Sequence, residues 1–155
     1  MGDSPRGEPT MREVKTEIVI HAPQEKVWQV LTDFPAYEAW NPVINGVKAT
    51  PQAGRSIRFK IKLFGQMLPM AAKIQRCEEN RYFGWGTDAD VPTNYVLGAH
   101  HYFELSPAGE NTTRLVHNEI FYGIVPRILW PVLKRLKASY DDMNRSLKAQ
   151  AESIA

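Results

Sequence analysis

Two different hydrophobic periods divide the chain, and their order constrains the fold more than any other feature. Near the C-terminus six apolar residues step by 4, 3, 4, 3 and 4: Leu129, Leu133, Leu136, Tyr140, Met143 and Leu147. This spacing predicts one face of a long helix that ends near Glu152. Pro131 cannot donate a backbone hydrogen bond, so the helix starts or kinks there, and residues 123–133 are predicted to be its irregular beginning. A coiled-coil seam would give a similar stripe, but barely three heptads favour a helix packed against its own core.

Upstream of this helix the apolar residues alternate, as they do in strands. Residues 14–20 place Val14, Thr16, Ile18 and Ile20 on one face. Two short helices are predicted next, over residues 22–33 and 34–40, and the Asn-Pro pair at 41–42 ends the second. Strand-like runs follow at residues 43–50, 56–64, 67–77, 81–87, 97–106 and 112–121. The predicted class is α+β, with an antiparallel sheet of about seven strands and the long helix across one face.

Length and charge exclude several other classes of protein. The 155 residues predict a disordered tail over residues 1–11 and a single domain over residues 12–155. A net charge of +2 argues against nucleic acid as a partner. The chain has no apolar run long enough to span a membrane and no signal-peptide core, which predicts a cytoplasmic protein. Cys77 is the only cysteine, so no internal disulfide forms. No cofactor motif occurs, and none is predicted to bind; the oligomeric state stays open.

His100 and His101 are adjacent in a chain that has four histidines. In a strand, successive side chains point to opposite faces, so the two cannot serve one centre. His101 shares its face with Phe103 and Leu105, and this more apolar face is predicted to be the concave one.

A polar cluster on that face takes the place of the histidine pair. If residues 107–111 close a hairpin with Leu105 opposite Thr113, then His101 lies opposite His117. Glu119 is two residues after His117 in the same strand and lies on the same face. Three interpretations stay open: a structural hydrogen-bonded group, groups that orient a ligand, and a metal site of two histidines and one carboxylate. Metal sites need further geometry that the sequence does not show, so no metal is predicted.

Four segments together resemble one protein family. They are "IHAPQEKVWQVLTDFPAYEAWNP" (20–42), "GAHHYFELSP" (98–107), "TTRLVHNEIFYG" (112–123) and "YDDMNRSLKAQAE" (140–152). Over residues 12–152 the chain resembles the START-like helix-grip superfamily, also called SRPBCC, in its polyketide cyclase/dehydrase branch. The resemblance implies a curved sheet wrapped around the long helix, two short helices that close one end, and an internal cavity that takes small hydrophobic molecules.

Aromatic and apolar side chains are predicted to line that cavity. Each of them alone is better explained as core packing, but together they exceed what a thin sheet-and-helix layer needs. The predicted ligand-binding set is Phe34, Tyr37, Trp40, Phe59, Ile61, Met70, Trp85, His101, Phe103, His117, Glu119, Phe121, Tyr140 and Met143, with Phe83 as a further inward-facing residue.

These features predict a protein that binds a small hydrophobic or amphipathic molecule, lipid-like or polyketide-like. The alternative is a polyketide cyclase-like or aromatase-like enzyme with His101, His117 and Glu119 as acid/base groups, helped by Arg76 or Tyr95. Whether any reaction is catalysed stays open. Residues 125–137 mix Ile, Leu and Trp with four cations, as membrane-interface segments do. A core helix with a solvated basic face is the favoured interpretation of that segment.

Overall fold

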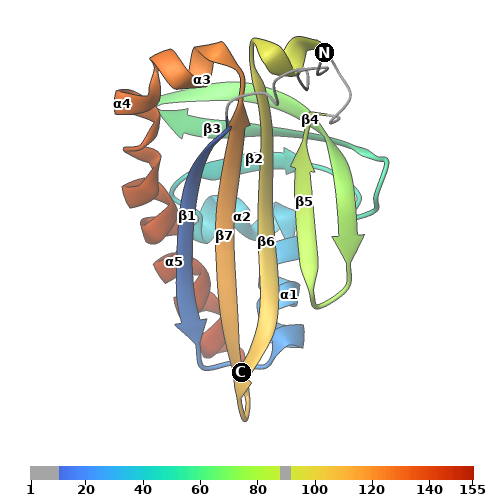
Figure 1. Ribbon diagram of the computed structural model, residues 1–155. Helices are drawn as coiled ribbons and strands as arrows, with labels where there is room; N and C mark the ends of the chain where they lie inside the picture. The colour runs from blue at the N-terminus through green and yellow to red at the C-terminus, as the bar shows by residue number, and fades with distance from the viewer. Residues whose placement is uncertain (1–10, 88–91) are drawn as a thin grey trace, which may run out of the picture.

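The computed structural model describes residues 11–87 and 92–155 (Figure 1). The strands are β1 (Met11–Ile20), β2 (Ile44–Lys48), β3 (Ser56–Leu63), β4 (Gln66–Glu78), β5 (Tyr82–Gly86), β6 (Gly98–Gly109) and β7 (Thr112–Tyr122). The helices are α1 (Gln24–Thr32), η1 (Phe34–Ala36), α2 (Tyr37–Trp40), η2 (Pro92–Tyr95), α3 (Ile124–Ile128), α4 (Trp130–Leu133) and α5 (Leu136–Ser153). The predicted tail lies outside the described residues except for Met11, which begins β1.

All seven strands form one antiparallel sheet in the order β1-β7-β6-β5-β4-β3-β2. The sheet is open, with β1 and β2 at its edges, and it curves around α5, which Figure 1 shows behind β1 and β7. α5 packs against β1 and α1. The predicted α+β class and the helix-grip architecture are therefore confirmed.

The alternation of side chains decides which face of the sheet meets the helix. In β3, Ile57, Phe59 and Ile61 are buried, whereas Arg58 and Lys60 between them are exposed. The same period buries His101, Phe103 and Leu105 in β6 and confirms that this face is the concave one. The buried residues of the inner face form one core cluster with Tyr140, Met143 and Leu147 of α5.

The two short helices after β1 follow the prediction with one change. Pro23 precedes α1 as its N-cap, and the second predicted helix consists of η1 followed by α2. Asn41 ends α2, and its side-chain Oδ1 accepts hydrogen bonds from the backbone N–H groups of Val43 and Ile44, each over 2.9 Å. These bonds turn the chain directly into β2.

The C-terminal helix is shorter than the apolar stripe suggested. Residues 124–133 form two short helices, α3 and α4, and Pro131 lies in the first turn of α4. Leu129 lies between them and is exposed, so its predicted place in the buried stripe is wrong. The stripe is fully buried only at Tyr140, Met143 and Leu147, where α5 is continuous. Within the described part of the chain, no helix is long and apolar enough to cross a membrane.

The β6–β7 hairpin is longer than predicted, and this corrects the register. The strands continue to Gly109 and Thr112, so the turn contains only residues 110–111. Leu105 therefore lies opposite Leu115, and His101 lies opposite Glu119. The predicted pairs of Leu105 with Thr113 and of His101 with His117 are wrong by two residues. A shift of two leaves every side chain on its predicted face.

Candidate functional site

The inner face of β6 and β7 carries the predicted polar cluster. His101 and Glu119 are cross-strand partners, and the adjacent pair on the same face joins Phe103 to His117. The Nε2 atoms of His117 and His101 are 2.8 Å apart, and His101 Nδ1 lies 3.6 Å from Glu119 Oε2. The hydroxyl of Tyr140, from α5, donates to the same oxygen. The structure therefore brings together the three acid/base candidates from the sequence.

A backbone carbonyl fixes the direction of the hydrogen bonds in this cluster. The hydroxyl of Thr16 donates to the carbonyl oxygen of His117 over 2.9 Å, and a carbonyl can only accept. Thr16 Oγ1 must then accept from Asn144 Nδ2, at 2.9 Å. This turns Asn144 Oδ1 toward His117 Nδ1 at 2.8 Å, so Nδ1 carries the hydrogen.

The direction of the hydrogen bonds extends through both histidines. Burial, and next to it the nearby His101, lowers the pKa of His117 well below its ordinary value, so this ring is neutral at pH 7. With its hydrogen on Nδ1, neutral His117 accepts at Nε2, and His101 donates from its own Nε2. His101 Nδ1 then faces Glu119 Oε2 at 3.6 Å, which is longer than a hydrogen bond. The ordered hydrogen bonds therefore include His101 and His117, and Glu119 lies beside them.

Aromatic rings hold the two imidazoles in place. The ring of His101 stacks on Trp85, with centroids 4.4 Å apart and planes 10° from parallel. The His117 ring lies 4.3 Å from Phe103 and 4.4 Å from Tyr140. Burial, with a contribution from Glu119, raises the pKa of the Tyr140 hydroxyl well above its ordinary value, so Tyr140 keeps its proton as a donor. Glu119 is the more accessible partner, with 13% of its side chain exposed against 4% for His101.

The geometry does not favour a metal ion at this cluster. Both ring nitrogens of His117 have hydrogen-bond partners, one of them the other histidine. Among residues 11–87 and 92–155, no group of three or more His, Cys, Asp or Glu side chains could hold a metal ion.

Most of the other predicted lining residues are part of the packed core. Phe59, Ile61, Trp85, Phe103, Phe121 and Met143 are buried on the inner side, as is Phe83. Met70 is an exception: it lies opposite Phe59, on the inner face, yet 46% of it is exposed. Its neighbour on that face, Leu68, lies opposite Ile61 and is 41% exposed. The inner face is therefore open to solvent along this part of β4.

The aromatic residues of the short helices lie beside the core. Phe34 packs against Phe83 with ring centroids 5.7 Å apart, and both Phe34 and Tyr37 are buried. The Tyr37 hydroxyl donates to the carbonyl oxygen of Leu31. Trp40 is partly buried against Tyr37, and its indole nitrogen is buried without a hydrogen-bond partner among the described residues.

The two predicted helper residues do not join the cluster. Arg76 lies on the outer face of the sheet, where its guanidinium is 4.3 Å from the centre of the Tyr82 ring. Tyr95 is exposed in η2. His100, as predicted, faces outward and pairs with the hydroxyl of Tyr82 at 2.9 Å.

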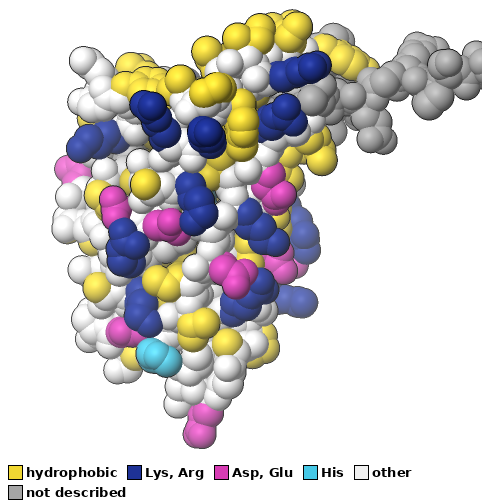
Figure 2. All heavy atoms as spheres, turned by 60° about the vertical axis from the view of Figure 1, so that its left-hand side comes forward, with side chains coloured by type: hydrophobic (Ala, Val, Ile, Leu, Met, Phe, Trp, Pro, Cys, Tyr) yellow, Lys and Arg dark blue, Asp and Glu magenta, His cyan; other side chains and the backbone are white. Residues whose placement is uncertain are grey.

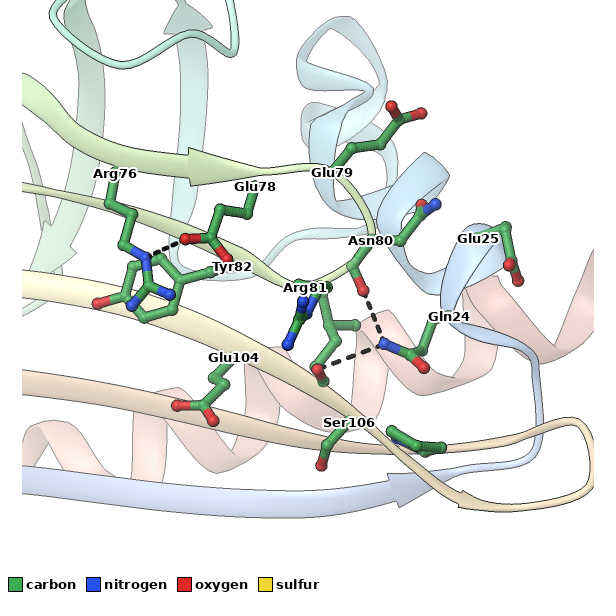
Figure 3. A pocket seen from close by; sticks show the side chains of 12 residues that line it. Gln24, Glu25, Arg76, Glu78, Glu79, Asn80, Arg81, Tyr82, Glu104 and Ser106 are labelled. Atoms are coloured by element: carbon green, nitrogen blue, oxygen red, sulfur yellow. Dashed lines mark hydrogen bonds and ion pairs between the residues drawn. The ribbon is translucent and has the colours of Figure 1, made fainter.

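A separate hollow of about 590 Å³ lies near Arg76 and the start of α1 (Figure 3). Its lining is largely charged and includes two polar pairs: Arg76 pairs with Glu78 at 2.6 Å, and Gln24 donates to the carbonyl oxygen of Asn80 at 2.8 Å. Such a surface offers little to an apolar molecule, so the candidate site remains the inner face.

Two functional candidates were missed at the level of sequence. Thr16 and Asn144 belong to the cluster, yet they lie 128 positions apart in the chain. The available signal was weak: Asn144 is one helical turn beyond Tyr140 on the buried side of α5.

Comparisons with known proteins agree with this fold. No curated protein matches the chain. The Zhui aromatase/cyclase from Streptomyces sp. R1128 is 16% identical over 92% of this chain and 94% of its own, with a TM-score of 0.73. A START superfamily protein from Mycobacterium smegmatis is 21% identical over 92% of this chain and 99% of its own, with a TM-score of 0.71. Norcoclaurine synthase from Thalictrum is 9% identical over 97% of this chain and 100% of its own, with a TM-score of 0.68.

At these identities the solved structures show the fold alone. The family follows from the sequence, because residues 11–152 match the family described as "Polyketide cyclase / dehydrase and lipid transport". This match covers almost all of the chain and confirms the polyketide cyclase/dehydrase resemblance drawn from its motifs, while the solved structures agree with a START-like fold. The chain therefore belongs to the polyketide cyclase/dehydrase and lipid transport family.

Proposed function

We propose that this protein binds a small hydrophobic or amphipathic molecule against the inner face of its sheet. The observation that carries the proposal is the exposure of Leu68 and Met70 on that face. In a sheet packed against its helix, inward side chains are normally buried, as their partners Ile61 and Phe59 are. Large apolar groups left open there provide a surface for an apolar ligand.

A continuous row of side chains joins this open surface to the polar cluster. Phe59, the partner of Met70, packs against Trp85 with ring centroids 5.5 Å apart, and Trp85 stacks on His101. Glu119, beside His101, is the partly exposed polar end of the row. An amphipathic molecule fits such a row, with its apolar part toward Met70 and its polar part toward Glu119. A cytoplasmic location is part of this proposal.

Two methionines of one strand allow a matched test. Met70 lies on the inner face and Met67 on the outer face, with 46% and 40% of their areas exposed. We expect Met70→Ser to weaken binding of the amphipathic dye 1-anilinonaphthalene-8-sulfonate about tenfold, and Met67→Ser to leave it unchanged. Native mass spectrometry of gently purified protein then identifies any natural ligand. Equal dye binding by both variants would exclude the inner face as the site.

The ordered cluster supports a second candidate function, an acid/base enzyme of the cyclase type. Its hydrogen bonds run in one direction, from His101 through His117 and Asn144 to Thr16, and Glu119 lies 3.6 Å from His101. A carboxyl group beside an apolar surface can hold and release a proton, which suits it to acid/base catalysis on a polyketide-like or related cyclic substrate. A structurally similar protein is named an aromatase/cyclase, which is consistent with this candidate.

Glu119→Gln tests the enzyme against the binding protein. The amide keeps the shape of the side chain but cannot transfer the proton. For an enzyme we expect loss of turnover, on a polyketide-type chain as the substrate, with dye binding retained. If turnover is unchanged in both Glu119→Gln and His117→Ala, the cluster is not catalytic.

A further inference from the structure

Large apolar side chains remain exposed at one end of the molecule, on three segments. The β3–β4 hairpin contributes Phe64, Met67, Leu68 and Met70. The segment after η2 contributes Tyr95, Val96 and Leu97, and the region around α3 contributes Ile124, Ile128 and Leu129. We call these residues the apolar rim. Figure 1 places α3, α4 and the β3–β4 turn at its upper end, and Figure 2 shows hydrophobic side chains gathered there.

A backbone contact joins two of the three segments of the rim. The backbone N–H of Val125 donates to the carbonyl oxygen of Val96 over 3.0 Å, which joins α3 to the segment after η2. Gly123 allows this approach, since its φ is 102° and a Cβ there would lie 2.6 Å from the Val96 oxygen. The hairpin turn and α5 line a common pocket of about 200 Å³ that includes Phe64, Ser139 and Asp142. The fold thus fixes α3 beside residues 95–97 and places the hairpin beside α5.

Cations outnumber carboxylates near the rim, although Asp142 lines the pocket that contains Phe64. No Asp or Glu occurs between residues 39 and 77, which include the hairpin, or between residues 120 and 140, which include α3 and α4. These two stretches carry seven and four of the 19 Lys and Arg residues. Lys62, Arg127, Lys134 and Arg135 are exposed beside the apolar side chains, and Figure 2 shows Lys and Arg side chains below and among the hydrophobic ones.

We propose that the apolar rim docks on the surface of a membrane that contains anionic lipid. Exposed isoleucine, leucine and phenylalanine insert among the acyl chains, while the surrounding cations contact lipid phosphates and carboxylates. Without a docking partner, these apolar side chains would remain in water. The exposed cations beside them favour a negatively charged partner. The favoured sequence interpretation, a core helix with a solvated basic face, does not account for Ile124, Ile128 and Leu129, which face solvent. Docking is independent of the proposed ligand, because vesicle binding is measured without one.

Vesicle flotation at low salt tests this inference. The probes are vesicles of phosphatidylcholine alone and vesicles with phosphatidylserine as about a third of the lipid. We expect the protein to float with the anionic vesicles and to be released by salt. Ile128→Ser should weaken partitioning by up to about 60-fold, since it removes three carbons that each contribute about fourfold when inserted. Lys134→Gln should weaken it about fivefold, the contribution of one cation near an anionic surface.

Matched control variants separate the rim from the rest of the surface. Val19 is 45% exposed on β1, and Lys15 is an exposed cation of the same strand. Val19→Ser and Lys15→Gln should leave flotation unchanged. The proposal is overturned if Ile128→Ser floats like the wild type, or if anionic lipid makes no difference. It is also overturned if sedimentation shows a dimer that Ile128→Ser dissociates, since a second copy then covers the rim.

Discussion

Acid should destabilise this protein through His117, and the structure gives the size of the effect. His117 is fully buried, and burial lowers its pKa well below 6.5, its ordinary value, in the folded state. The unfolded chain therefore binds a proton below about pH 6.5 that the folded chain does not, and stability is lost as the pH falls. Each pH unit below 6.5 costs up to about 1.4 kcal/mol. Between about pH 7 and pH 5 the loss is at most about 2 kcal/mol, a large part of a typical folding free energy.

Urea unfolding followed by tryptophan fluorescence measures this loss in the wild type and in His117→Gln. The glutamine does not titrate, so the difference between the two pH profiles isolates His117 from the carboxylates. His21→Gln is the control, because His21 is exposed on the surface. His100, half-buried and with its pKa lowered chiefly by burial, should contribute a smaller loss of the same sign. If the wild type and His117→Gln lose the same stability on acidification, the assignment of a neutral buried His117 is wrong.

Three further substitutions test the packing. Asn144→Leu removes the hydrogen-bond partner of His117 Nδ1 and should lower the free energy of urea unfolding by about 2 kcal/mol. An unchanged free energy of unfolding would mean that the ordered hydrogen bonds through His117 are not formed. Gly86→Ala should abolish folding or sharply lower the melting temperature, because a Cβ there would lie 2.1 Å from the carbonyl oxygen of Ala99. An unchanged melting temperature would contradict this close approach of β5 to β6. Trp40→Ala should lower the free energy of unfolding by about 3 kcal/mol if Trp40 serves as a packed core residue. A small loss of stability with faster release of the dye would instead place Trp40 at the entrance of the binding site.

The faces of the strands were predictable from sequence, and the exact pairing was not. Period-two alternation placed His101 inward and His100 outward, and both assignments hold. The register was wrong because residues 107–109 extend β6 although they contain Pro and Gly. The predicted cluster survived this error, since Glu119 replaced His117 as the partner of His101 on the same face.

Exposure was harder to predict than orientation. Met70 points to the predicted face but remains open to solvent, whereas α5 packs chiefly against β1 at one edge of the sheet. Leu129 fits the helical period, yet the helix is interrupted beside it. Asn144 and Thr16 entered the cluster through long-range packing, which no local pattern records.

The place of β1 in the sheet has a consequence for synthesis. β1 leaves the ribosome first, but its neighbour in the sheet is β7, and the pair Thr16 and His117 is separated by 101 positions. At about 5 to 20 residues per second, the nascent β1 therefore waits about 5 to 20 s without its partner. During that interval its alternating apolar face has no sheet to join, which makes it a natural binding segment for a ribosome-associated chaperone.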